Sequence, residues 1–201
     1  MQTDPNRMDE LSKGAFAPVY PLIANQITAK TGINKGVCID IGAGPASLSI
    51  ALAQISDLKI YAMDVCKDMC GLSKKNIEAK GLTDRIIPVR GDVHKIPFAS
   101  EFADIIISRG SLPFWKCKSK AFREINRVLK PNGIGYVGGG FGGRELKEKI
   151  ARELNNPKNG QAIPRPPKIN SDSLELAIEK AHIDNYTVIN DDSGLWVLIK
   201  K

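Results

Sequence analysis

Short apolar runs alternate with longer segments of helical periodicity along most of the chain. The periodic segments predict helices at 46–54, 67–80, 117–129, 142–154 and 172–181. The apolar runs predict buried strands at 36–41, 58–63, 85–90, 102–108, 133–138, 185–190 and 194–200. Strands that alternate with helices of this length form right-handed, parallel βαβ units. The pattern therefore predicts a doubly wound α/β fold.

The C-terminal end of the chain departs from this alternation. Its last two predicted strands are joined only by Asp191–Gly194, which is too short for a crossover and permits only an antiparallel hairpin. The expected sheet is thus mostly parallel and seven-stranded, in a single domain over 1–201. Before the last helix, residues 155–170 are rich in proline and polar side chains, which predicts an irregular loop and a candidate lid.

Apolar positions at helical spacing also precede the first strand, with interruptions at Pro18 and Pro21. We expect a short helix, a break and a second helix that ends near Gly32. Because this segment carries Phe16 and Tyr20, we interpret residues 8–32 as a helical cap that folds over a ligand crevice or simply covers one face of the sheet.

A strand, a Gly-x-Gly turn and a helix follow one another at the start of the sheet. The strand ends at Asp40-Ile41, Gly42 and Gly44 form the turn, and the helix starts near Ala46. Glycines at a strand end let a ligand approach the backbone, and a helix start offers unpaired N–H groups. Such a unit is a ligand cradle at the edge of a parallel sheet, although a tight turn alone can also require these glycines.

Two further acids stand at the ends of the next predicted strands. Asp64 follows Gly44 by twenty positions, a spacing at which a carboxylate meets a ribose diol, and Asp92 closes the third strand. Together with Asp40 they favour an adenosine-containing ligand. A nicotinamide dinucleotide would favour a third glycine, and Ser47 stands there instead.

Composition and charge narrow the possible location, partners and metal content of the protein. No apolar stretch approaches the roughly 20 residues of a membrane span, and the polar start lacks a signal peptide's hydrophobic core, so we expect a cytoplasmic protein. A net charge of +7 suits a polyanionic partner, but the basic residues are dispersed over helix faces, which does not favour nucleic acid. Four cysteines and two histidines lack the spacing of a zinc site, so we expect no metal, and the roles of Cys66, Cys70 and Cys117 stay open.

Several motifs together resemble class I S-adenosylmethionine-dependent methyltransferases. The segment 40–46 is similar to their first motif, and Asp64 matches the acid that ends their second strand. Residues 91–98, 102–106 and 122–133 resemble their later motif stretches. The pattern is similar to the small-molecule branch, particularly quinone-ring methyltransferases, while 108–111 and 138–143 resemble small stand-alone enzymes of anaerobic prokaryotes. The resemblance implies the Rossmann-like methyltransferase fold and S-adenosylmethionine as cofactor, with S-adenosylhomocysteine as product.

The resemblance also implies residue roles. In it, Gly42 and Gly44 let the methionine part of the cofactor approach, Asp64 binds the ribose and Asp92 accepts from the adenine amino group. The full set of cofactor contacts that it implies is Asp40, Gly42, Ala43, Gly44, Asp64, Val65, Asp92, Val93 and Ser108.

The sequence indicates the residues that contact the methyl acceptor less specifically than those that contact the cofactor. Arg109 and His94 are the candidate catalytic residues, His94 as a general base and Arg109 as an anchor for an acidic group. The candidate acceptor contacts are Arg109, Trp115, Tyr20, Gly139 and Gly140. We expect a methyltransferase for a small-molecule O, N, S or C nucleophile. An RNA methyltransferase and a non-catalytic cofactor-binding protein stay open as alternatives, as does the oligomeric state.

Overall fold

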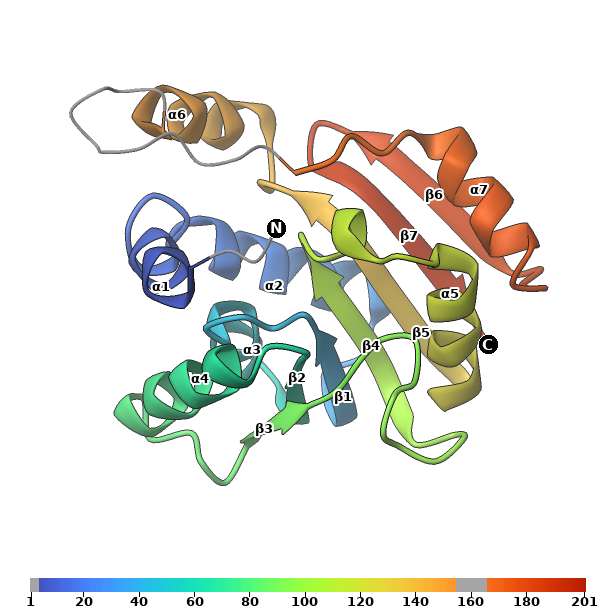
Figure 1. The fold of residues 1–201 in the computed structure, drawn as a ribbon, viewed down its shortest axis with the longest axis horizontal. Helices are drawn as coiled ribbons and strands as arrows, with labels where there is room; N and C mark the ends of the chain where they lie inside the picture. The colour runs from blue at the N-terminus through green and yellow to red at the C-terminus, as the bar shows by residue number, and fades with distance from the viewer. Residues whose placement is uncertain (1–3, 155–165) are drawn as a thin grey trace.

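A computed structural model describes residues 4–154 and 166–201 and shows one seven-stranded sheet with helices on both faces (Figure 1). The strand order is β3-β2-β1-β4-β5-β7-β6. The five strands from β1 to β5 are parallel, and β7 pairs antiparallel with both β5 and β6. The expected α/β sheet with an antiparallel C-terminal hairpin is confirmed. The strands are β1 (Lys35–Ile41), β2 (Asp57–Asp64), β3 (Ile86–Arg90), β4 (Ala103–Arg109), β5 (Leu129–Gly140), β6 (Tyr186–Asp191) and β7 (Gly194–Lys200).

Helices surround the sheet in two layers. One layer is built on α2, α3 and α4, and the other on α5 and α7 (Figure 1). The helices are α1 (Pro5–Lys13), α2 (Val19–Thr31), α3 (Ser47–Ala53), α4 (Lys67–Ala79), α5 (Lys118–Val128), α6 (Arg144–Leu154) and α7 (Ser171–Glu179), with a 3₁₀ turn η1 (Leu112–Phe114). Within the described ranges, no helix has the length and apolar character needed to cross a membrane.

Strand β4 shows why the apolar runs in the sequence are not interrupted by polar residues. Ile105 and Ile107 face the core under α2 and α3, and Ile106 between them faces the core under α5 and α7. All three are fully buried. A strand covered on both faces needs apolar residues at every position, which is typical of parallel sheets.

Three local expectations differ from the structure. Pro21 does not break a helix, because it lies in the first turn of α2, where the proline nitrogen needs no helical partner. Strand β5 begins at Leu129, before the expected turn, and its register with β4 shifts between Ala103 and Ile105. The turn η1 was not expected. The candidate lid 155–170 lies outside the described residues from 155 to 165.

Candidate functional site

The sheet reverses its order of strands between β1 and β4. From β1 the chain winds outward to β2 and β3, and from β4 it winds the other way to β5. In such sheets the carboxyl ends at the reversal diverge and leave a crevice for ligands. The turn after β1 and the segment 108–111 after β4 therefore meet at this point, on the side toward which the arrowheads of β4 and β5 point in Figure 1.

The two glycines of the first turn serve different purposes. Both have positive φ, +69° at Gly42 and +53° at Gly44. A Cβ on Gly42 would collide with the side chain of Ser111, whereas a Cβ on Gly44 would have no atom within 4 Å. The close neighbour of Gly42 is thus part of the protein, and the open space belongs to Gly44.

Ser111 joins the two sides of the crevice and was not singled out by the sequence. Its Oγ lies 3.1 Å from the carbonyl oxygen of Ile41 and 2.7 Å from Ser108 Oγ. It also accepts a 3.1 Å hydrogen bond from the indole N–H of Trp115. Trp115 and Ser108 are themselves buried. These contacts place Trp115 behind the crevice wall, where it holds Ser111, instead of in open acceptor space.

Asp64 ends β2 beside the same turn. Its two carboxylate oxygens each accept a 2.9 Å bond from a backbone N–H, one from Gly44 and one from Cys66 at the start of α4. These two bonds fix the carboxylate plane and leave further lone pairs on each oxygen. The exposed Val65 follows directly, so this edge presents an oriented carboxylate next to an apolar side chain.

Asp92 and His94 form a tether to the start of α5. Asp92 Oδ1 accepts from the backbone N–H of His94 at 2.8 Å and lies 2.6 Å from its Nδ1. The backbone hydrogen bond is the main reason why the pKa of Asp92 is lowered. His94 Nε2 accepts from the Cys117 N–H at 3.1 Å, which assigns the proton to Nδ1. With both ring nitrogens engaged, the geometry argues against His94 as a general base.

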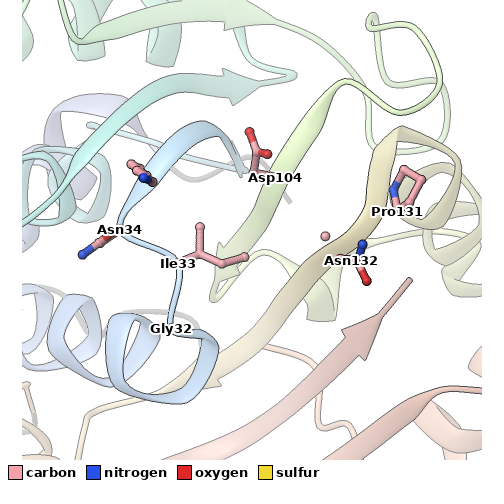
Figure 2. A pocket seen from close by; sticks show the side chains of 8 residues that line it. Gly32, Ile33, Asn34, Asp104, Pro131 and Asn132 are labelled. Carbon is pink, nitrogen blue, oxygen red and sulfur yellow. The ribbon is translucent and has the colours of Figure 1, made fainter.

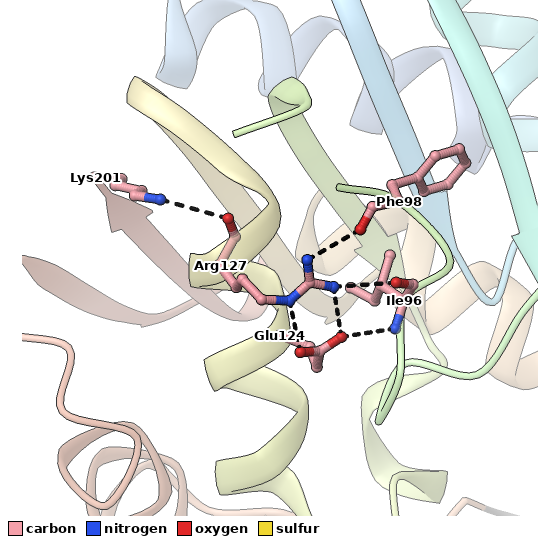
Figure 3. Close-up of polar contacts among 5 residues, drawn as sticks. All are labelled: Ile96, Phe98, Glu124, Arg127 and Lys201. Atoms are coloured by element: carbon pink, nitrogen blue, oxygen red, sulfur yellow. Dashed lines mark hydrogen bonds and ion pairs between the residues drawn. The ribbon is translucent and has the colours of Figure 1, made fainter. Parts of the chain in front are cut away.

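A second set of contacts holds the 91–98 segment against helix α5 (Figure 3). Glu124 on α5 accepts a 2.8 Å bond from the Ile96 N–H and pairs with Arg127. Arg127 in turn donates to the carbonyl oxygens of Ile96 and Phe98, at 3.1 and 3.0 Å. Two motif stretches that are separate in the sequence are therefore in direct contact. Val93, in the same segment, is buried in the core beneath it.

Asp40 lies under the turn and not in the open crevice. It is 2% exposed, and its Oδ2 accepts a 2.7 Å bond from Ser49 Oγ at the start of α3. Burial raises the pKa of Asp40 to about 7, with a smaller contribution from the charge of Asp64. The neighbouring Ala43 is partly buried against the core.

Arg109, at the end of β4, is surrounded by aromatic rings. Its guanidinium carbon lies 5.2 Å from the ring centre of Phe16, 5.6 Å from Tyr20 and 5.4 Å from Phe141. Its Nε donates to the Gly140 carbonyl oxygen at 3.1 Å. The N-terminal segment and the tip of β5 thus converge on the residue that the sequence placed at the acceptor side.

Gly139 and Gly140, the last two residues of β5, differ in how much room a side chain would have. A Cβ on Gly140 would collide with the Ser193 carbonyl oxygen, so this glycine is required by the close pairing of β5 and β7. A Cβ on Gly139 would make only an ordinary contact, 3.7 Å from Gly110 Cα. Gly139 therefore borders the crevice, whereas Gly140 contributes its carbonyl oxygen to Arg109.

Helix α1 is tied to the first turn through α4. The buried Asn76 side chain donates to Asp9 Oδ1 at 2.8 Å and to the Pro45 carbonyl oxygen at 3.1 Å. Asp9 also pairs with Lys13 at 2.6 Å. A hollow of about 210 Å³ separates α1 from α6 and opens beside Ala15. Asn76 thus links the N-terminal segment to the turn after β1.

A larger hollow of about 300 Å³ lies at the opposite end of the central strands, where β1 and β4 begin (Figure 2). Asp104, in its wall, accepts from the Val37 N–H at 2.7 Å and pairs with Lys130 at 2.8 Å. These contacts secure the start of β1 and are remote from the crevice. Within residues 4–154 and 166–201, no three side chains of His, Cys, Asp or Glu come together as a metal site would require.

Comparison with known proteins identifies the family. The methyltransferase-domain family matches residues 39–137, from β1 to β5. A Methanococcus maripaludis crystal structure, provisionally described as an S-adenosyl-L-methionine-dependent methyltransferase, is 43% identical with a TM-score of 0.90. The match covers all of this chain and 97% of that one. This chain belongs to the S-adenosylmethionine-dependent methyltransferases.

Curated relatives of this methyltransferase are more distant. A Bacillus subtilis protein named as an uncharacterised methyltransferase is 30% identical over 51% of this chain and 55% of its own length. A ubiquinone/menaquinone biosynthesis C-methyltransferase from Francisella philomiragia is 29% identical over 57% of this chain and 47% of its own. The chain thus spans about half the length of the curated relatives that it matches.

The residues at the first turn fit the cofactor of this methyltransferase. The space at Gly44 is free of protein atoms, and the Asp64 carboxylate beside it is oriented with lone pairs available. Asp92, whose side chain is 55% exposed, stands at the next strand end. An adenosyl group with a hydroxylated ribose needs such acceptors, so the chemistry of the donor and acceptor groups agrees with S-adenosylmethionine.

Proposed function

We propose that this methyltransferase transfers the methyl group to a small molecule. The observation that carries the proposal is the enclosure of Arg109, because Phe16 and Tyr20 of the N-terminal segment lie within 5.6 Å of its guanidinium. A macromolecular acceptor would need an open surface at the end of β4. We therefore assign residues 8–32, in the expected single domain 1–201, as the cap of the acceptor site.

The contacts described above support the following proposed roles on the cofactor side. Gly44 leaves room for the methionine part, Asp64 accepts from the ribose hydroxyls, and Asp92 accepts from the adenine amino group. Asp40 acts from beneath the turn, through Ser49. Gly42 supports the turn by accommodating Ser111. Ala43, Val65, Val93 and Ser108 complete the surroundings as apolar or structural neighbours.

Bound S-adenosylmethionine supplies an activated methyl group on a sulfonium. The chain's own part is then to position the acceptor and to exclude water, which can supply much of the rate. Arg109 is the residue that would orient an acidic acceptor. The name of the Francisella relative, a C-methyltransferase, supports a carbon nucleophile. An oxygen, nitrogen or sulfur acceptor uses the same positioning.

Calorimetric titration tests the cofactor side. We expect S-adenosylhomocysteine to bind more tightly than NAD, and Asp64→Ala to weaken its binding about tenfold or more, since charge-assisted hydrogen bonds contribute about 1.5–3 kcal/mol. Asp57→Ala, at the exposed opposite end of the same strand, is the matched control and should bind normally. Equal binding by Asp64→Ala, or tighter binding of NAD, would refute the assignment.

The acceptor class is tested with the radiolabelled methyl donor and a fractionated cell extract. Label is expected in the low-molecular-weight fraction. Transfer to the RNA fraction would replace this proposal with the RNA alternative. Binding of the donor without transfer to any fraction would favour a non-catalytic protein.

A further inference from the structure

Arg109 carries a positive charge into the enclosed side of the crevice without a carboxylate partner. No ion pair among the described residues includes it. Among the described residues, its contacts are a hydrogen bond to the Gly140 carbonyl oxygen and the rings of Phe16, Tyr20 and Phe141. Its burial lowers the pKa of the guanidinium.

These contacts leave the guanidinium incompletely satisfied. An arginine has five N–H donors, and the hydrogen bond to the Gly140 carbonyl oxygen engages one of them. Ring faces attract the cation but accept no strong hydrogen bond. An enclosed charge of this kind is stabilised most by an anion that pairs with it in a bidentate manner.

Open space lies next to Arg109 along the chain. A Cβ atom added to Gly110, the residue after Arg109 at the end of β4, would have no neighbour within 4 Å. Tyr20 is 9% exposed, and the centre of its ring lies 5.6 Å from the guanidinium carbon. Arg109 ends β4, which pairs with β1 in parallel, so a group bound at Arg109 would lie at the same strand ends as the turn after β1.

We propose that the acceptor is a monocarboxylate with a flat apolar body, bound through Arg109 and Tyr20 against the paired rings of Phe16 and Phe141. This inference rests on the proposed small-molecule methyltransferase function and specifies its substrate class. A carboxylate balances the single positive charge, whereas a phosphate dianion would leave an uncompensated charge in a dry compartment. The rings provide apolar walls for the rest of the molecule.

The carboxylate is a handle and not the methylated group. Oxygen lone pairs that accept hydrogen bonds from a guanidinium are poor nucleophiles. The methylated atom is therefore another atom of the acceptor. With S-adenosylmethionine bound, this atom would form the new bond to the methyl carbon as the carbon–sulfur bond breaks, and a proton carried by this atom would pass to solvent water. The electron pair of that bond stays on sulfur, which gives the neutral thioether product.

Ligand-detected NMR titrations of the protein saturated with S-adenosylhomocysteine test the inference. The probes are benzoate, benzamide and phenyl phosphate, which share a ring and differ in charge. We expect benzoate to bind at least about tenfold more tightly than the other two. Arg109→Met should abolish this preference, and Tyr20→Phe, which keeps the ring, should weaken benzoate about threefold. Arg123→Met removes an exposed positive charge on α5 and is the matched control.

Each outcome is decisive. Equal binding of benzoate and benzamide, or a preference for benzoate that survives Arg109→Met, overturns the inference. Tighter binding of phenyl phosphate replaces the carboxylate with a phosphate class and also overturns it. If Arg109→Met does not fold, Arg109→Lys, which keeps the charge but loses the planar fork, must lose most of the preference. Failure of the wild type to bind S-adenosylhomocysteine would instead refute the proposed function, and this is measured first.

Discussion

The side chain of Ser111 fills the space that a Cβ on Gly42 would need, and this contact can be tested by substitution. Gly42→Ala introduces a methyl group that collides with Ser111 Cβ and lies 2.7 Å from its Oγ. Gly44→Ala is the matched control, because it also has positive φ but no neighbour within 4 Å. Both substitutions strain the backbone, and only the first overpacks the crevice.

The expected magnitudes follow from these contacts. Alanine at positive φ costs about 1 kcal/mol. Overpacking costs about 1–3 kcal/mol more, so Gly42→Ala should lower the free energy of unfolding by about 3 kcal/mol and Gly44→Ala by about 1. Ser111→Gly loses three hydrogen bonds at about 1 kcal/mol each, including that of the Trp115 indole. In that background Gly42→Ala meets no side chain and should cost only about 1 kcal/mol.

Urea unfolding of the wild type, Gly42→Ala, Ser111→Gly and the double variant gives the coupling energy between positions 42 and 111. We expect about 2 kcal/mol, with the double variant more stable than the sum of the single effects predicts. The control should show the opposite balance. Gly44→Ala should lose only the roughly 1 kcal/mol of backbone strain but should also lose affinity for S-adenosylhomocysteine, because its methyl group would occupy the proposed cofactor space. Additive losses at positions 42 and 111, or equal destabilisation by Gly44→Ala and Gly42→Ala, would refute the packing argument.

Three further outcomes follow from the contacts of the fold. Arg127→Lys loses its planar bonds to the 91–98 segment, so urea unfolding should show a loss of about 1–2 kcal/mol and calorimetry a weaker S-adenosylhomocysteine complex. Burial raises the pKa of Asp40 to about 7, so the folded state binds more protons than the unfolded state up to that pH. The wild type should therefore lose stability relative to Asp40→Asn as pH rises from about 4 to 7. A stability difference that does not change with pH would contradict this. Gly138→Ala collides with the backbone of β7 and should lower the melting temperature by several degrees, whereas Gly139→Ala should leave it nearly unchanged.

Periodicity predicted the central strands of the fold because they are covered on both faces. The run Ile105–Ile107 is apolar throughout and could only be a fully buried strand. The antiparallel hairpin could also be predicted from the sequence, since the connection between β6 and β7 is too short for a crossover. The start of β5 could not be predicted, because Leu129 pairs with Ala103 through a register shift that depends on tertiary contacts.

The site was predictable to the extent that it depends on spacing along the chain. Asp40, Asp64 and Asp92 were found by their place after apolar runs, and all three occur at or just beyond strand ends. What their side chains contact was not predictable. His94 looked like a free titratable group, but its partners come from Asp92 and from the backbone of Cys117, and the latter is distant in sequence.

Ser111 shows why local motifs omit part of a site. It is not close in sequence to either glycine, and it reaches the first turn because β4 lies beside β1 at the reversal of the sheet. Gly42 therefore has two explanations that sequence cannot separate, a ligand or a neighbouring strand end. The contact with Ser111 favours the second, which leaves Gly44 and the two exposed-edge acids, Asp64 and Asp92, as the residues available to a cofactor. In the proposed site, binding would then depend on how Ser111 holds the first turn and how Arg127 holds the 91–98 segment.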